Sequence, residues 1–194
     1  MQSDKEKYIG LSGAVALAHF FLREKVKPGD RVADATCGNG HDTLLLARLV
    51  GPAGQVWAFD VQEAALAGTR TLLGEAGCLE QVEIVAAGHE RLAEFIRGPL
   101  HAVVFNLGYL PGGDKDVITR PATTIPALAA ALDLLAPGGF LLVVVYTGHH
   151  GAREEEEAVA SWAAGLDPRR YYVWTCRQPN RSAAAPFLVL AEKG

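Results

Sequence analysis

A glycine-rich turn carries the first residues that could bind a ligand. The segment ADATCGNGHDT, residues 33–43, places this turn between a short apolar run and a helical pattern. Gly38 and Gly40 let the backbone pass close to a ligand, and the amides at the helix start favour its negative end. Twenty residues after Gly40, Asp60 ends a second apolar run, where a carboxylate can accept hydrogen bonds from both hydroxyls of a ribose. The pattern predicts a cofactor that contains adenosine.

Two nucleoside cofactors compete for this turn. A dinucleotide site expects a third glycine where this chain has Thr43. S-adenosylmethionine has no pyrophosphate and needs less room, and a carboxylate such as that of Asp34 can hold its ammonium group. The segment LLAPGGFLLVVV, residues 134–145, also resembles a helix-to-strand turn common in methyltransferases that use this donor. Each glycine alone would be an ordinary turn, but together these features favour S-adenosylmethionine. Its expected contacts are Asp34, Thr36, Gly38, Asn39, Gly40, Asp42, Thr43, Asp60, Gln62 and His89.

A second site is expected where Asn106 and Tyr109 follow another apolar run. The spacing Asn-X-X-Tyr resembles the Asn-Pro-Pro-Tyr box of methyltransferases that act on nitrogen. In that box the Asn side chain and a following carbonyl, here that of Leu107, accept hydrogen bonds from the target amine, and the ring packs against it. Two such acceptors aim the lone pair of the amine, and orientation of this kind lowers a reaction barrier. Asn106 and Tyr109 are therefore the predicted catalytic residues, with a strand cap and a surface ring as the structural alternative.

The elements that must position these residues alternate along the chain. Short apolar runs separated by helical patterns predict repeated βα units around a mostly parallel sheet. Expected strands cover residues 31–35, 55–60, 82–85, 101–106, 140–145, 171–176 and 186–190, with helices at 11–25 and near 154–166. A hairpin between the last two strands would place one antiparallel strand in the sheet. We expect a doubly wound, Rossmann-like α/β fold of the class I methyltransferase type, with seven strands.

Length and composition restrict the alternatives. A chain of 194 residues, 49% hydrophobic and 21% charged, can bury one substantial core, so we expect a single domain over residues 1–194. Three widely spaced cysteines have neither a disulfide framework nor a metal-binding spacing, which favours a reducing cytoplasm and no metal site. No signal peptide or run of about 18 uncharged apolar residues is present, so neither secretion nor membrane insertion is expected. A net charge of −4 argues against tight, sequence-blind binding to nucleic acid but permits a local basic face.

Taken together, the motifs resemble the YtqB-like family of methyltransferases. They are the glycine turn, FDVQ at residues 59–62, NLGYLPGGDK at 106–115, YTGHHG at 146–151, and Asn180 ahead of Pro186 and Phe187. The likeness covers nearly the whole chain after the first helix, and the NLGYLP box is its most diagnostic part. Members carry the label rRNA methylase. The resemblance nevertheless implies methylation of the amine of 5-aminomethyl-2-thiouridine at the wobble position of tRNA, a base that composition and spacing alone do not name.

The remaining candidates concern the proton and the RNA. An aliphatic amine must lose a proton before it attacks, and His149, Asp114 and Asp116 are candidate bases by motif, although we favour deprotonation into solvent. The expected contacts to the tRNA anticodon loop are Leu107, Lys115, Arg120, His149, Arg177 and Arg181, with Arg169 and Arg170 as further basic residues. Tyr109 is the leading candidate for stacking on a base.

Several interpretations stay open. The charge run 153–157 is interpreted as the solvated first turn of a helix, and His19 as a structural residue. The alternatives to tRNA methylation are an rRNA methyltransferase, a methyltransferase for a small amine or a protein, and a cofactor-binding module without catalysis. A dinucleotide-dependent oxidoreductase is ranked below these alternatives. Both a monomer and a homodimer are compatible with the sequence.

Overall fold

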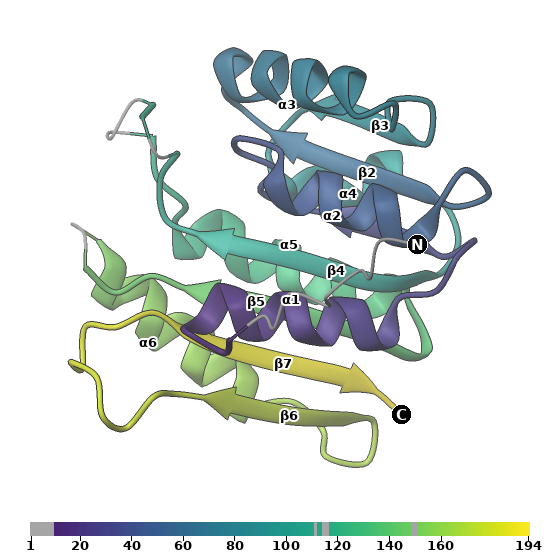
Figure 1. Ribbon diagram of the computed structural model, residues 1–194. Helices are drawn as coiled ribbons and strands as arrows, with labels where there is room; N and C mark the ends of the chain where they lie inside the picture. Colours follow the sequence, from purple (N-terminus) through teal and green to yellow (C-terminus); the bar gives the residue numbers. More distant parts are fainter. Residues whose placement is uncertain (1–9, 111, 114–116, 149–150) are drawn as a thin grey trace.

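A seven-stranded sheet organises the computed structural model, which describes residues 10–110, 112–113, 117–148 and 151–194 (Figure 1). The strands are β1 (Arg31–Asp34), β2 (Gln55–Asp60), β3 (Val82–Ala86), β4 (Leu100–Leu107), β5 (Leu135–Val145), β6 (Tyr171–Cys176) and β7 (Phe187–Lys193). Their order is β3-β2-β1-β4-β5-β7-β6. β7 runs antiparallel to its two neighbours, β5 and β6, and the other six strands run in one common direction. The predicted fold class is confirmed, including the hairpin that inserts one antiparallel strand.

Helices cover both faces of the sheet (Figure 1). They are α1 (Ala14–Lys25), α2 (His41–Val50), α3 (Glu63–Glu75), η1 (His89–Arg91), α4 (Leu92–Phe95), α5 (Pro121–Leu134) and α6 (Ala152–Ala164). Side chains alternate across a strand, so β4 contributes side chains to two separate hydrophobic cores. Val103 and Phe105 pack on the side of α4, α5 and α6, whereas Ala102 and Val104 pack on the side of α1 and α2. Burial on both faces explains why the central strands are almost continuously apolar.

The start of β5 differs from the prediction. The strand was expected from residue 140, but Leu135 already pairs with Leu100, while Phe140 pairs with Ala102. The intervening residues form an irregularity in the ladder, and Gly138 adopts a positive φ of 75° there. A side chain on Gly139 would lie 2.8 Å from the backbone oxygen of Leu100, so this tight passage requires a glycine. The segment is therefore both a turn and the first ladder contact of the strand.

The sheet order changes direction between β1 and β4, which are parallel neighbours. The chain leaves β1 toward β2 on one side and leaves β4 toward β5 on the other. The carboxyl ends of two such strands border the crevice where open α/β sheets bind ligands. Asp34 ends β1 and Asn106 lies next to the end of β4, so the topology brings both to this crevice. Among the described helices, none is sufficiently long and apolar to cross a membrane.

Packing of α1 against the sheet gives a first prediction. Leu22 is fully buried in the core beneath α1, whereas Leu11, just before the helix, is 52% exposed. Replacing Leu22 with Ala should lower the free energy of unfolding by about 2 to 5 kcal/mol, because the lost contacts leave a cavity. The matched change Leu11→Ala should alter it by less than about 0.5 kcal/mol. Urea unfolding measures both, and equal losses would contradict the described packing of α1.

Candidate active site

Asp34 is the buried carboxylate on which the β1–α2 turn is built. One carboxylate oxygen accepts a hydrogen bond from the Thr36 amide at 3.2 Å, and the other accepts one from the Thr43 hydroxyl at 2.6 Å. Burial, followed by the negative charge of nearby Asp42, raises the pKa of Asp34 to about 7. The side chain is completely buried, so these donors are its compensation for lost water. Asp34 thus fixes the turn and can change its charge close to neutral pH.

Asp60 connects the glycine turn to the end of β2. Its two carboxylate oxygens accept hydrogen bonds from the Gly38 amide at 3.0 Å and the Gln62 amide at 2.9 Å. Each oxygen of a carboxylate can accept more than one hydrogen bond, so acceptor capacity remains for a ligand hydroxyl. Gly40 has a φ of 79°, and a side chain there would come within 2.8 Å of the Thr69 hydroxyl on α3. The second glycine is therefore required by local conformation and by packing on α3.

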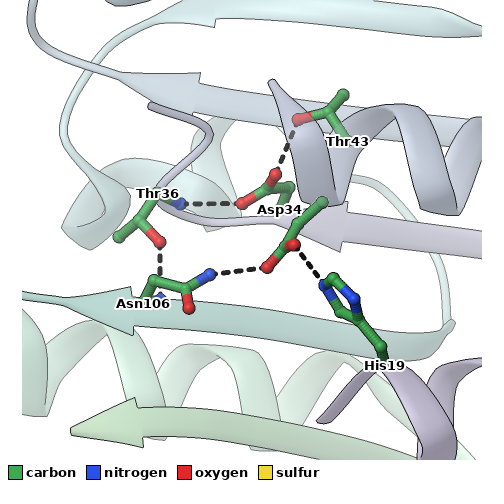
Figure 2. A network of polar contacts seen from close by, with 6 residues as sticks. His19, Asp34, Thr36, Thr43 and Asn106 are labelled. Carbon is green, nitrogen blue, oxygen red and sulfur yellow. Dashed lines mark hydrogen bonds and ion pairs between the residues drawn. The ribbon is translucent and has the colours of Figure 1, made fainter. Parts of the chain in front are cut away.

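Asn106 is held by two independent contacts. Its backbone amide donates to the Thr36 hydroxyl at 2.7 Å, and its side-chain Nδ2 donates to Asp42 Oδ2, also at 2.7 Å. The other oxygen of Asp42 lies 2.6 Å from Nε2 of His19. Figure 2 shows the resulting chain of contacts, which runs from His19 on α1 to Asn106 and onward through Thr36 to Asp34. The predicted catalytic asparagine therefore has a defined orientation.

The contact between His19 and Asp42 was missed by sequence reasoning, which placed His19 among the structural residues. Burial by itself would raise the pKa of Asp42, but the hydrogen bond and charge of His19 and the hydrogen bond from Asn106 outweigh it. The pKa of Asp42 therefore lies below its ordinary value, and the side chain is a carboxylate near neutral pH. A histidine among apolar helix positions carries no sequence signal that its partner lies on another helix. The sequence spacing of 23 residues between the two is uninformative.

A cavity of about 830 Å³ lies over these residues. Ligand sites in proteins span roughly 300 to 1,000 Å³, so a cofactor of nucleoside size and part of a substrate can share this space. Of the predicted site residues, the cavity is lined by Thr36, Gly38, Asn39, Asp42, Asp60, Gln62, His89, Asn106, Leu107 and Tyr109. Asp34, Gly40 and Thr43 support this lining from behind, and His19 and Tyr146 line it as well. The structure thus brings together the two predicted sites, although Gly38 and Asn106 are 68 residues apart in the sequence.

His89 is buried in η1 and lines the cavity. Its ring packs edge-on against Phe105, with 5.7 Å between the ring centres. Burial lowers the pKa of His89 from its ordinary value, so the imidazole is neutral at neutral pH. A neutral imidazole offers one donor and one acceptor and adds no positive charge to the cavity.

Glu155 corrects the interpretation of the acidic run as a solvated turn. Its carboxylate, only 2% exposed, accepts hydrogen bonds from the hydroxyls of Thr119 and Thr124, both at 2.6 Å. Thr119 in turn accepts a hydrogen bond from the Gly108 amide at 2.8 Å, within the loop between Asn106 and Tyr109. The prediction was wrong at this position because α6 packs against α5 with Glu155 facing inward, and the two threonines satisfy its charge. Glu155 therefore anchors the Asn-Leu-Gly-Tyr loop through Thr119.

The basic residues proposed for RNA binding are dispersed. Arg120 is exposed at the start of α5, and Arg181 borders a second cavity of about 420 Å³ that also touches Tyr146. Arg177 donates to Glu156 at 2.7 Å and lies 3.5 Å above the ring of Phe187. Lys115 and His149, together with the candidate bases Asp114 and Asp116, lie outside the described residues. No group of His, Cys, Asp and Glu side chains with metal-binding geometry occurs in the described part of the chain.

Comparison with known proteins identifies the family. The family model described as "Putative rRNA methylase" matches residues 56–192. A chloroplastic tRNA (mnm(5)s(2)U34)-methyltransferase from Arabidopsis thaliana is 40% identical over 95% of this chain and 70% of its own length. The chain belongs to the rRNA methylase family. Ubiquinone/menaquinone C-methyltransferases also match, for example that of Teredinibacter turnerae at 35% identity, but over 63% of this chain and 45% of that enzyme.

Solved structures from this family have the same architecture. An rRNA methylase candidate from Clostridium thermocellum superposes with a TM-score of 0.93 at 40% identity, covering 95% of this chain and 100% of that one. A candidate methyltransferase from Streptococcus mutans, in complex with SAH, gives a TM-score of 0.87 at 36% identity, with 95% and 100% covered. SAH is what remains of S-adenosylmethionine after methyl transfer. This member of the rRNA methylase family is an S-adenosylmethionine-dependent methyltransferase, and the predicted enzyme class and cofactor are confirmed.

The raised pKa of Asp34 gives a prediction for stability. An acid whose pKa rises from 3.8 to about 7 on folding binds its proton more tightly in the folded state. Its contribution to stability is therefore present below about pH 4 and is lost as the pH rises toward 7, by up to about 1.4 kcal/mol per pH unit. Asn cannot ionise, and its amide can keep the contacts to Thr36 and Thr43. In urea unfolding without cofactor, Asp34→Asn should become more stable relative to the unchanged protein between pH 5 and pH 7.5.

The difference between the two proteins removes the contributions of titrating groups that do not interact with Asp34. A constant difference across this range would show that Asp34 keeps an ordinary pKa in the folded protein.

Proposed function

We propose that this enzyme methylates the exocyclic amine of 5-aminomethyl-2-thiouridine at the wobble position of tRNA. The main supporting observation is the orientation of Asn106, whose Nδ2 donates to Asp42. Its Oδ1 is thereby directed away from Asp42, and we assign this oxygen to the cavity that Asn106 lines. An acceptor at that place suits a nitrogen nucleophile that carries N–H groups. The name of the Arabidopsis relative, which specifies a modified uridine at position 34 of tRNA, supports the choice of this amine.

The cofactor would lie across the turns at the ends of β1 and β2. Asp60 and Gln62 line the part of the cavity assigned to the ribose, and the turn from Thr36 to Gly40 with Asn39 lies toward the amino-acid end. An ammonium group bound near this turn would favour the ionised form of Asp34, whose pKa is raised to about 7 without it, and His89 is assigned to the adenine side. These residues fit the cofactor because carboxylates that can bind hydroxyl groups line the cavity. No Lys or Arg is among the described residues that line it. When bound, S-adenosylmethionine supplies an electrophilic methyl group on a sulfonium.

The substrate amine would be oriented by the chain itself. Asn106 Oδ1 and the Leu107 carbonyl accept its N–H groups, so that its lone pair points into the cavity. Tyr109 is 44% exposed at the cavity wall, where its ring can pack against the uridine. An alkyl ammonium has no lone pair, so the amine must first lose a proton, and the open cavity permits this loss to solvent. Arg120, Arg177 and Arg181, with Lys115 and His149, are assigned to the surrounding RNA.

Methylation of rRNA is the second candidate, and the family description favours it. The two candidates differ in the nucleoside that gains the methyl group. Purified enzyme and isotope-labelled S-adenosylmethionine should be incubated separately with tRNA that carries unmethylated aminomethyl groups and with rRNA. We expect label in tRNA alone, on the exocyclic amine of 5-aminomethyl-2-thiouridine, as measured by mass spectrometry of the nucleosides. Fully methylated tRNA serves as the matched control and should take up no label.

Label in rRNA, on a ring carbon, or on a free small amine with equal efficiency would contradict this substrate. The same digest distinguishes these outcomes, since each product has a different mass or fragmentation.

Loss of the Asn106 side chain should affect turnover far more than cofactor binding. In Asn106→Ala the amine loses one of two orienting acceptors, and misplacement of a reacting group lowers turnover by about tenfold to a hundredfold. The dissociation constant for S-adenosylmethionine, measured by calorimetry, should change by less than about twofold because the proposed cofactor contacts are made by other residues. Equal losses of turnover and cofactor affinity would reassign Asn106 to the cofactor.

A further inference from the structure

We infer that His19 and Asp42 form a positioning pair, which holds the side-chain amide of Asn106 with its oxygen toward the substrate amine. The inference rests on the proposed function, because it explains how the acceptor in the cavity comes to face the nucleophile. His19 lies on α1 and Asp42 on α2, and neither falls within residues 56–192, the part matched by the family model.

The first step concerns the two possible orientations of an amide. The oxygen and nitrogen ends of an Asn side chain have nearly the same shape, so packing alone hardly distinguishes them. A carboxylate only accepts hydrogen bonds, so the nitrogen of Asn106 must face Asp42, at 2.7 Å. The oxygen is then directed away from Asp42. If the amide were flipped, its oxygen would face a carboxylate oxygen of Asp42. The cavity would then present the N–H groups of Asn106 to a substrate amine whose own N–H groups need acceptors.

The second step concerns the charge of Asp42. Protonated, its carboxyl group would carry an O–H donor and could hold Asn106 in the reversed orientation. His19 opposes this, because Nε2 at 2.6 Å from Oδ1 must donate to the carboxylate and stabilises its ionised form. Asp42 is only 9% exposed, so water cannot fully replace that donor. His19 therefore acts on Asn106 through Asp42.

The third step is that the pair controls only the side chain. The backbone of Asn106 is fixed separately by the Thr36 hydroxyl at 2.7 Å (Figure 2). In addition, β4 is paired on both sides, with β1 and β5. Loss of His19 should therefore leave the strand and the cofactor turn in place. This separation makes a positioning role distinguishable from a structural one.

The kinetic experiment compares His19→Ala with His19→Gln. The alanine variant should lower kcat on the tRNA substrate by about tenfold to a hundredfold, the scale on which misplaced groups reduce turnover. KM and the dissociation constant for S-adenosylmethionine should stay within about twofold. The glutamine variant should recover most of the loss, since its amide can also donate to Asp42. Glu24→Ala, an exposed change one turn further along α1, is the matched control and should leave kcat unchanged.

A second measurement needs no substrate. The side-chain amide signals of Asn106 in a ¹⁵N-labelled sample are assigned by their loss in Asn106→Ala. One of the two protons should be shifted by its bond to Asp42, and this shift should be lost in His19→Ala but kept in His19→Gln and Glu24→Ala. Thermal unfolding of each variant confirms that the fold is intact.

Wild-type kcat together with unchanged Asn106 signals in His19→Ala would overturn the inference. So would a fall in kcat without any change in those signals, since His19 would then act on the substrate directly, and so would a matching fall in cofactor affinity. If the unaltered enzyme does not methylate this tRNA, the proposed substrate fails, while the amide signals still decide whether the pair orients Asn106.

Discussion

Two carboxylates that lie close together at the end of β1 cannot both be ionised at low cost, and the site is arranged around that constraint. The pKa of Asp34 is raised by burial and by the charge of Asp42, while that of Asp42 is held low by His19 and Asn106. Like charges in a shared buried environment separate in pKa in this way. The negative charge near neutral pH is thereby concentrated on Asp42, the carboxylate in contact with Asn106.

Hydrogen bonds that satisfy these carboxylates also link the two predicted sites. From His19 the contacts pass through Asp42, Asn106, Thr36 and Asp34 to Thr43, and Thr43 follows Asp42 directly in the chain. The contacts that run from Asp42 to Thr43 therefore form a closed ring at the start of α2. Since each member depends on its neighbours, the glycine turn after β1 and the loop after β4 have a fixed relative position. Such preorganisation avoids reordering of polar groups during the reaction.

Residues at strand ends were predictable from the sequence, since parallel strands place their carboxyl ends together. Asp60 and Asn106 each follow an apolar run, and the structure brings both to one cavity as expected. His19 and Glu155 were not predictable, because their partners are set by how helices pack across 23 residues in one case and 31 or 36 in the other. Periodicity reports which face of a helix is apolar, but not which polar group lies opposite a particular side chain. The strand at 135–139 was missed for a related reason, since a turn sequence can also make a ladder contact.

Under the proposed function, a chain with a net charge of −4 would recognise RNA more through the cavity than through phosphate contacts. Two of the basic residues considered for RNA already have acidic partners, Arg177 with Glu156 and Arg169 with Asp167. Exposed ion pairs of this kind contribute little to stability, so a phosphate group can replace the carboxylate at little cost. The binding free energy gained from such a phosphate contact is also small, because the phosphate replaces a carboxylate that is negatively charged as well. Under the proposed function, discrimination among RNA sites therefore falls to the acceptors of Asn106 and Leu107 and to the ring of Tyr109, which would respond to the amine and the base and not to the backbone charge.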